Sequence, residues 1–187
     1  MNTADVLCTK KEHILKNWLD KVRTEIPLVN NYDQTAIQNS VPELIDSIIE
    51  ILVTNNSDKL ISHSVEHGWQ RSKHNAYSMK NIIKEYNLLR AEIFRVVDDN
   101  MDVTSRDDRD IILEAVNNAI EVAAEAFYDE KQSVLVNARK IAEMKADQLK
   151  IEEKNREEFI QSIIHDLNSP LNNIKACIEM QIGRAHV

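Results

Sequence analysis

One histidine of this 187-residue chain stands next to a group that would help it act as a nucleophile. His165 is followed directly by Asp166. A neutral imidazole is a nucleophile near neutral pH. A carboxylate that accepts a hydrogen bond from one ring nitrogen fixes the tautomer and activates the other nitrogen. Because phosphoryl transfer depends mostly on positioning, a phosphoryl group is a suitable electrophile for such a pair.

The residues around this pair have the spacing of an amphipathic helix. An apolar residue recurs every four positions, and the same face continues beyond Pro170, through Phe159, Ile163, Leu167, Leu171, Ile174 and Ile178. His165 falls off this face, so we expect it to meet solvent. Pro170 lacks a backbone donor, which predicts a kink in the helix. A His-Asp pair alone is also typical of an ordinary solvated helix surface.

The longer string His-Asp-Leu-Asn-Ser-Pro-Leu, with Phe159 six residues before the histidine, resembles the H-box of sensor histidine kinases, the HisKA dimerisation and phosphoacceptor domain. The resemblance covers residues 155–180. It implies that His165 is the phosphoacceptor and Asp166 the acidic helper, and that the helix dimerises as part of a four-helix bundle. The family usually has Thr or Asn four residues after the histidine, where Ser169 stands here. This departure leaves phosphatase activity at Ser169 unassigned.

Apolar periodicity predicts an all-α domain over residues 1–130. We expect helices near residues 9–25, from Ser40 to the Asn55–Asp58 cluster, from Ser57 onward, at 78–100, and after Thr104 or Ser105. Gly68 within the third helix indicates a bend, a helix end or close packing. No Gly or Pro occurs between Ser105 and Pro170, which predicts one long helix, or two with a joint near 129–133.

Most of residues 10–130 resembles the N-terminal sensor domain of RsbR-type stressosome proteins. The resemblance rests on Glu66-His67-Gly68-Trp69-Gln70-Arg71, on Tyr77, and on the stretch from Ile82 to Arg90. It implies a globin-like helical fold without haem and a dimeric input module. A non-enzymatic stressosome-like scaffold is therefore the alternative to a kinase.

Histidines and charged residues of the same region suit two other kinds of site. His63 and His67 lie four apart, the spacing of a helical metal pair, and His74 is nearby. We expect surface or core-edge histidines instead, with neither a metal nor haem, although a haem-binding gas sensor is a third hypothesis. Arg71, Glu85 and Arg90 are expected to form a structural ion-pair set rather than a signal site.

The segment 131–154 is a charged linker that precedes the phosphoacceptor helix. A weak coiled-coil series at a spacing of seven runs through Leu135, Ala142, Leu149, Arg156 and Ile163. Because a dimerising helix follows, we expect a parallel helical linker in a homodimer.

Composition narrows the class of protein further. The net charge of −8 argues against nucleic-acid binding and against an anionic membrane surface. Cys8 and Cys177 form no disulfide framework, which indicates a reducing compartment. There is no apolar signal region and no run long enough to span a membrane, so we expect a cytoplasmic protein.

Residues 181–187, Gln-Ile-Gly-Arg-Ala-His-Val, read like a translated sequencing adapter. We therefore expect only the residues up to about Met180 to come from the natural reading frame. The ATP-binding boxes of the kinase family are absent from the chain, and no P-loop replaces them. The sequence therefore predicts the N-terminal part of a cytosolic two-component sensor histidine kinase. ATP and Mg would bind elsewhere in the full-length protein, and a response-regulator receiver domain would take the phosphoryl group from His165.

Overall fold

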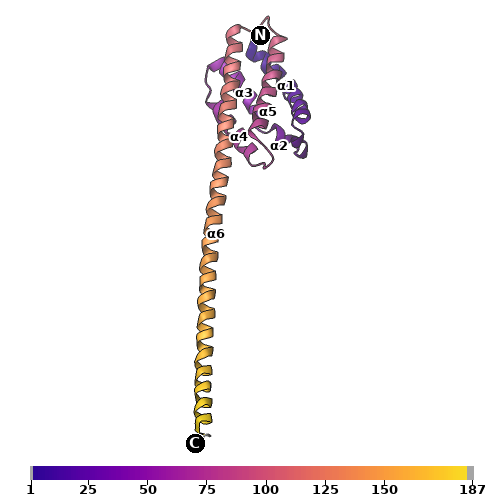
Figure 1. Cartoon of the computed structure of the whole chain (residues 1–187). Coiled ribbons are helices and arrows are strands. Elements are labelled where there is room, and N and C mark those ends of the chain that lie inside the picture. The colour runs from indigo at the N-terminus through magenta and orange to yellow at the C-terminus, as the bar shows by residue number, and fades with distance from the viewer. Residues whose placement is uncertain (1, 185–187) are drawn as a thin grey trace. The chain divides into compact units, whose positions relative to one another are not determined.

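The computed structural model describes residues 2–184, and within them every regular element is a helix, which confirms the all-α prediction. The chain divides into two units, Met1–Val134 and Leu135–Val187. In order along the chain, the elements are α1 (Thr3–Glu25), the 3-10 helix η1 (Pro27–Asn31), α2 (Gln34–Gln38), α3 (Val41–Thr54), α4 (Asp58–Ser72), α5 (Met79–Asp98) and α6 (Arg106–Arg184) (Figure 1).

The first helix begins earlier than the sequence analysis predicts, at Thr3 rather than near residue 9. Its start is fixed by a reciprocal capping box. The Asn2 side chain accepts from the backbone N–H of Asp5 at 2.9 Å, and the Asp5 carboxylate accepts from the backbone N–H of Asn2 at 3.0 Å. Both bonds satisfy donors that a helix N-terminus otherwise leaves free, so the helix extends back to this pair.

The start of α6 is tied to the start of α1. Ser105 caps α6 by accepting from the backbone N–H of Asp108 at 3.0 Å. The Asp108 carboxylate in turn accepts from the buried Thr3 hydroxyl at 2.7 Å, and this bond holds the pKa of Asp108 below its usual value. The amino ends of the first and last helices of the unit are therefore joined by one polar network.

The long helix α6 is continuous through residues 129–133 and across Pro170 to Arg184, so no joint divides it. The break in apolar pattern after Met180 therefore does not end the helix at that point. Residues 185–187 of the proposed adapter-derived tail lie outside the described residues.

The core of the first unit lies between α1 and the two helices that pack on it, α3 and α5, and α3 also packs on α4. Trp18 is fully buried at its centre. The helix α4 approaches α6 closely at Gly68, where an added Cβ would lie 2.1 Å from the carbonyl oxygen of Ala123. Of the three interpretations of Gly68, close packing is the one that the structure shows.

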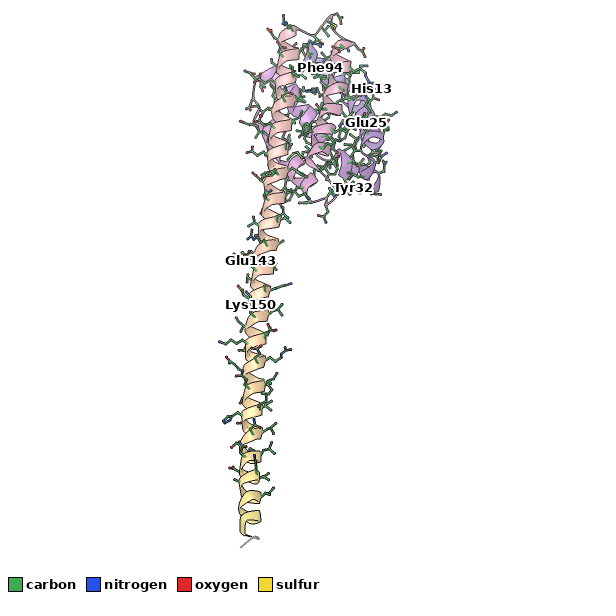
Figure 2. The ribbon with its side chains drawn as sticks, in the orientation of Figure 1. His13, Glu25, Tyr32, Phe94, Glu143 and Lys150 are labelled. Carbon is green, nitrogen blue, oxygen red and sulfur yellow. The ribbon has the colours of Figure 1, made fainter. Side chains whose placement is uncertain are left out.

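The second unit, as far as its side chains are described, is one helix with every residue from Leu135 to Ile178 exposed. Glu143 and Lys150, labelled in Figure 2, are examples on its polar surface. Among residues 2–184, no helix has the length and apolar character needed to cross a bilayer.

Candidate functional site

The predicted phosphoacceptor lies in the helix of the second unit and is open to solvent. The His165 side chain is 85% exposed and that of Asp166 is 76% exposed. The Nδ1 atom of His165 lies 3.4 Å from Oδ1 of Asp166, near the upper limit of a hydrogen bond. When Nδ1–H faces the carboxylate, Nε2 keeps its lone pair and points to solvent, which is the arrangement that a nucleophile needs.

Ser169 is exposed one helical turn after His165, so its hydroxyl lies on the same side of the helix as the imidazole. The position is suitable for orienting water near a modified histidine. No contact of the structure assigns it that role, and its function stays a prediction.

The apolar face that the sequence predicts beside His165 is present and has no partner within the described chain. Its large side chains are between 41% and 65% exposed: Phe159, Ile163, Leu167, Leu171, Ile174 and Ile178. Contiguous apolar surface of this kind is rare on a monomer and marks an association surface.

A second group of titratable side chains is buried inside the first unit, around the carboxylate of Glu85. Its Oε2 atom accepts from His67 Nε2 and from Arg71 Nε, both at 3.0 Å. Its Oε1 atom accepts from the hydroxyl of Tyr77. Burial opposes the ionisation of Glu85, but the charge of Arg71 and the bonds from His67 and Tyr77 outweigh it and hold its pKa below the usual value. Glu85 is therefore a buried anion with donors on both oxygens.

His67 is held in one tautomer by this cluster. Since Nε2 donates to Glu85, Nδ1 is left as an acceptor for the hydroxyl of Ser40 at 3.0 Å. Burial lowers the pKa of His67, and the charge of Arg71 lowers it further. The imidazole is therefore neutral at physiological pH, with both nitrogens occupied by protein groups.

Arg71 extends the cluster to the end of the short helix α2. Its two terminal nitrogens donate to the backbone carbonyls of Ala36, at 2.9 Å, and Ile37. These carbonyls belong to the last turn of α2, where a helix lacks internal donors. Arg71 thereby links α2, α4 and α5 through one guanidinium, which suits a structural role.

The ion-pair set differs in one member from the set predicted. Arg71 and Glu85 meet, but Arg90 lies outside the cluster and donates instead to Asn117 at 3.4 Å. Two further members were not predicted from the sequence: Ser40, and Trp18, whose indole donates to the backbone carbonyl of Glu85 at 3.0 Å. Neither is close in sequence to its partner, so no spacing rule could have found it.

The histidines of the metal hypothesis are directed elsewhere. His63 Nδ1 lies 2.9 Å from the hydroxyl of Ser47. The ring of His74 packs at a tilt of 49° against that of Tyr32, labelled in Figure 2, with ring centroids 4.3 Å apart. His67 is fully buried, so the expectation of a surface or core-edge position is wrong for it. Among the described side chains, those of residues 2–178, no three His, Cys, Asp or Glu residues gather as a metal site would require.

The chain was compared with protein-family models, with curated proteins and with solved structures, and none of them matches it. The resemblances to the HisKA H-box and to the RsbR-type sensor domain thus depend on the residues of this chain alone. The evidence on function therefore comes from the geometry at His165 and from the buried cluster at Glu85.

Proposed function

We propose that this chain is the sensing and phosphoaccepting part of a cytosolic two-component sensor histidine kinase, with His165 as the phosphorylated residue. The single observation that carries the proposal is the exposed His165–Asp166 pair beside an unpartnered apolar face. The motif string around the pair supports it. The first unit would be the input module and the helix of the second unit the output.

In this proposal the reaction at His165 is a direct phosphoryl transfer. The lone pair of Nε2 forms a bond to the γ-phosphorus of ATP, and the bond from that phosphorus to the bridging oxygen breaks, so that ADP leaves with the electron pair. Asp166 accepts the hydrogen bond from Nδ1–H and stabilises the positive charge that develops on the ring. Mg²⁺ and ATP would be bound by a further domain of the kinase. The phosphoryl group would then pass to an aspartate of a response regulator.

The same proposal includes a parallel homodimer. Side chains from Phe159 to Ile178 leave a continuous apolar face exposed on one helix, and burying it against a second copy would remove that face from water. Leu135 and Leu149, both more than 60% exposed, extend apolar surface into the linker at the predicted spacing of seven.

The proposal is tested by restoring a phosphoryl donor. Residues 1–178 are fused in helical register to the second helix and ATP-binding domain of a HisKA-type kinase, and the fusion is incubated with labelled ATP and Mg²⁺. We expect acid-labile, base-stable label that His165→Gln abolishes and that His63→Gln, a matched histidine control on α4, leaves unchanged. Label that persists in the His165→Gln protein would refute the assignment, and a complete lack of label would favour the non-enzymatic scaffold.

A further inference from the structure

A hollow on the surface of the first unit combines an apolar floor with an acidic rim. It lies between α4 and α6 and has a volume of about 520 Å³. Val65 and Trp69, one turn apart on α4, are 45% and 38% exposed, and Ala126 of α6 lies opposite them. With Ile61, which is 40% exposed, they form an apolar strip along α4 at a spacing of four. We call this surface the α4–α6 groove.

The rim of the α4–α6 groove carries three carboxylates. Glu66 stands on the α4 side, and Asp129 and Glu130 stand on the α6 side. Lys131 follows Glu130 but donates to the backbone carbonyl of His74 and does not line the groove. With a net charge of −8 on the whole chain, the groove lies in a field that attracts cations.

The aromatic face in the groove already holds a cation from the chain itself. The ammonium group of Lys73 lies over the indole of Trp69, 2.9 Å from the ring centroid. A positive charge over an aromatic face is favourable because of the ring quadrupole. Lys73 therefore shows that the ring of Trp69 can hold a cation. A basic side chain of a partner could contact the same ring and the three carboxylates.

A second copy of the chain is a poor occupant for this groove. A symmetric contact would place the same carboxylates against one another, and like charges across an interface are unfavourable.

We propose that the α4–α6 groove is a docking surface for a basic amphipathic helix of a partner protein. The apolar side chains of that helix would cover Val65 and Trp69, and its Lys or Arg residues would pair with Glu66, Asp129 and Glu130. The proposal gives the first unit a binding function that does not depend on the phosphoacceptor at His165.

The probe for the experiment is a fluorescein-labelled synthetic helix of leucine and lysine, with leucines on one face. A peptide of the same composition in scrambled order and an acidic version with glutamate for lysine are the comparison ligands. Affinity is measured by fluorescence anisotropy at two salt concentrations.

Indole emission gives a second readout, because Trp18 is fully buried and Trp69 is the tryptophan that a quencher in solution reaches. We expect the basic helix to bind and to protect Trp69 from acrylamide, and the other two peptides to bind far more weakly.

Three variants test the groove itself. Trp69→Ala should weaken binding about tenfold, since aromatic anchors dominate such contacts. Asp129→Asn with Glu130→Gln should weaken binding and also reduce its salt dependence. Lys73→Met keeps the aliphatic stem but removes the competing charge, so it should strengthen binding by about threefold.

The matched controls lie on other surfaces of the same unit. Ile83→Ala removes an apolar side chain as exposed as Trp69, and Glu114→Gln with Glu121→Gln removes two carboxylates from a second acidic hollow on α6 whose lining has no aromatic residue. Both controls should bind like the unaltered protein.

Equal binding of the scrambled peptide, or an equal loss in the Glu114 and Glu121 variant, would overturn the proposal. So would a change of oligomeric state in the Asp129 and Glu130 variant without peptide, because the groove would then be an interface between copies. If Trp69→Ala does not fold, the Asp129 and Glu130 variant decides.

Discussion

The Nε2 atom of His67 lies 3.0 Å from Oε2 of Glu85, and each of the two side chains is only 1% exposed. A neutral imidazole thus donates to a buried carboxylate whose other neighbours are Arg71 and Tyr77. The positive charge that balances Glu85 comes from Arg71, because burial and Arg71 itself both disfavour the protonated form of His67. The free energy of unfolding of the first unit should therefore depend on pH, because His67 titrates. It should also depend on the ion pair between Arg71 and Glu85.

The first prediction concerns pH. The pKa of His67 is lower in the folded state than the ordinary value, and so is that of the half-buried His74. The unfolded chain therefore takes up these protons first, below about pH 6.5. The free energy of unfolding should fall as the pH decreases from about 6.5 toward the folded-state values, by up to about 1.4 kcal/mol per pH unit for the buried His67 and by less for the more exposed His74.

Urea unfolding between pH 7.5 and 5 measures this slope. His67→Gln keeps a side-chain N–H for Glu85 but cannot titrate, so the slope should decrease in that variant. A slope that is the same with and without His67 would contradict the assignment of a neutral, buried imidazole.

The second prediction concerns the charge of the cluster. Glu85→Gln leaves Arg71 buried beside a neutral amide, and breaking a buried pair in this way typically costs about 3–5 kcal/mol. Glu25→Gln is the control, because Glu25, labelled in Figure 2, pairs with Lys84 at 3.0 Å while both side chains are partly exposed. An exposed pair is worth less than about 1 kcal/mol. Adding Arg71→Met to Glu85→Gln should cost less than the sum of the two single changes, and strict additivity would show that the two charges do not interact.

The third prediction concerns the contact between α4 and α6. Gly68→Ala would place a methyl group 2.1 Å from the carbonyl oxygen of Ala123 unless the backbone moves. We expect a loss of about 1–3 kcal/mol from overpacking, despite the better helix propensity of alanine. Ser62→Ala, at an exposed position of the same helix, should be neutral or slightly stabilising. Thermal unfolding of both variants measures the difference, and an unaltered melting temperature for Gly68→Ala would show that the helices have room to separate.

Helix type and order could be predicted from the sequence because apolar spacing and caps act locally. The helix expected from Ser40 to the Asn55–Asp58 cluster is an example, since α3 spans Val41–Thr54. The start of α1 was missed because it depends on the reciprocal bonds of Asn2 and Asp5 ahead of the first strong apolar repeat.

The two candidate sites differ in how far the sequence could describe them. His165 and Asp166 are adjacent in the chain, so the pair could be named from the sequence, but consecutive helical residues point about 100° apart and their 3.4 Å approach is seen only in the structure. The Glu85 cluster joins residues of α1, α2, α4 and α5 and of the two connecting segments that hold Ser40 and Tyr77, and Ser40 lies 27 positions before His67. His67 and Arg71 of α4 meet Glu85 of α5 only in the folded structure, which is why Arg90, close in sequence to Glu85, was wrongly grouped with it.

The fourth prediction concerns association through the second unit. Ile163→Lys and Leu167→Lys would each place a charge in the proposed dimer seam, and we expect the dissociation constant to rise by about 30-fold or more. Gln161→Lys adds the same charge to an exposed position off the apolar face and should have little effect. Sedimentation at several concentrations measures the change. A chain that is monomeric before any substitution would contradict the homodimer.

The fifth prediction separates the roles of the residues around His165 in the kinase fusion described above. Asp166→Asn preserves the helix but removes the carboxylate that lies 3.4 Å from Nδ1, so the imidazole loses the group that fixes its tautomer and stabilises its charge. Because acid–base assistance of this kind is typically worth about 10²–10⁴-fold, the rate of phosphorylation should fall by an amount in that range. Ser169→Ala should leave the rate of phosphorylation nearly unchanged, since the role proposed for its hydroxyl concerns only the later loss of the phosphoryl group. Rapid-quench kinetics with labelled ATP measure both rates, and circular dichroism confirms that the helix is intact. If Asp166→Asn is phosphorylated as fast as the unaltered protein, the carboxylate has no part in the transfer and His165 acts without a helper.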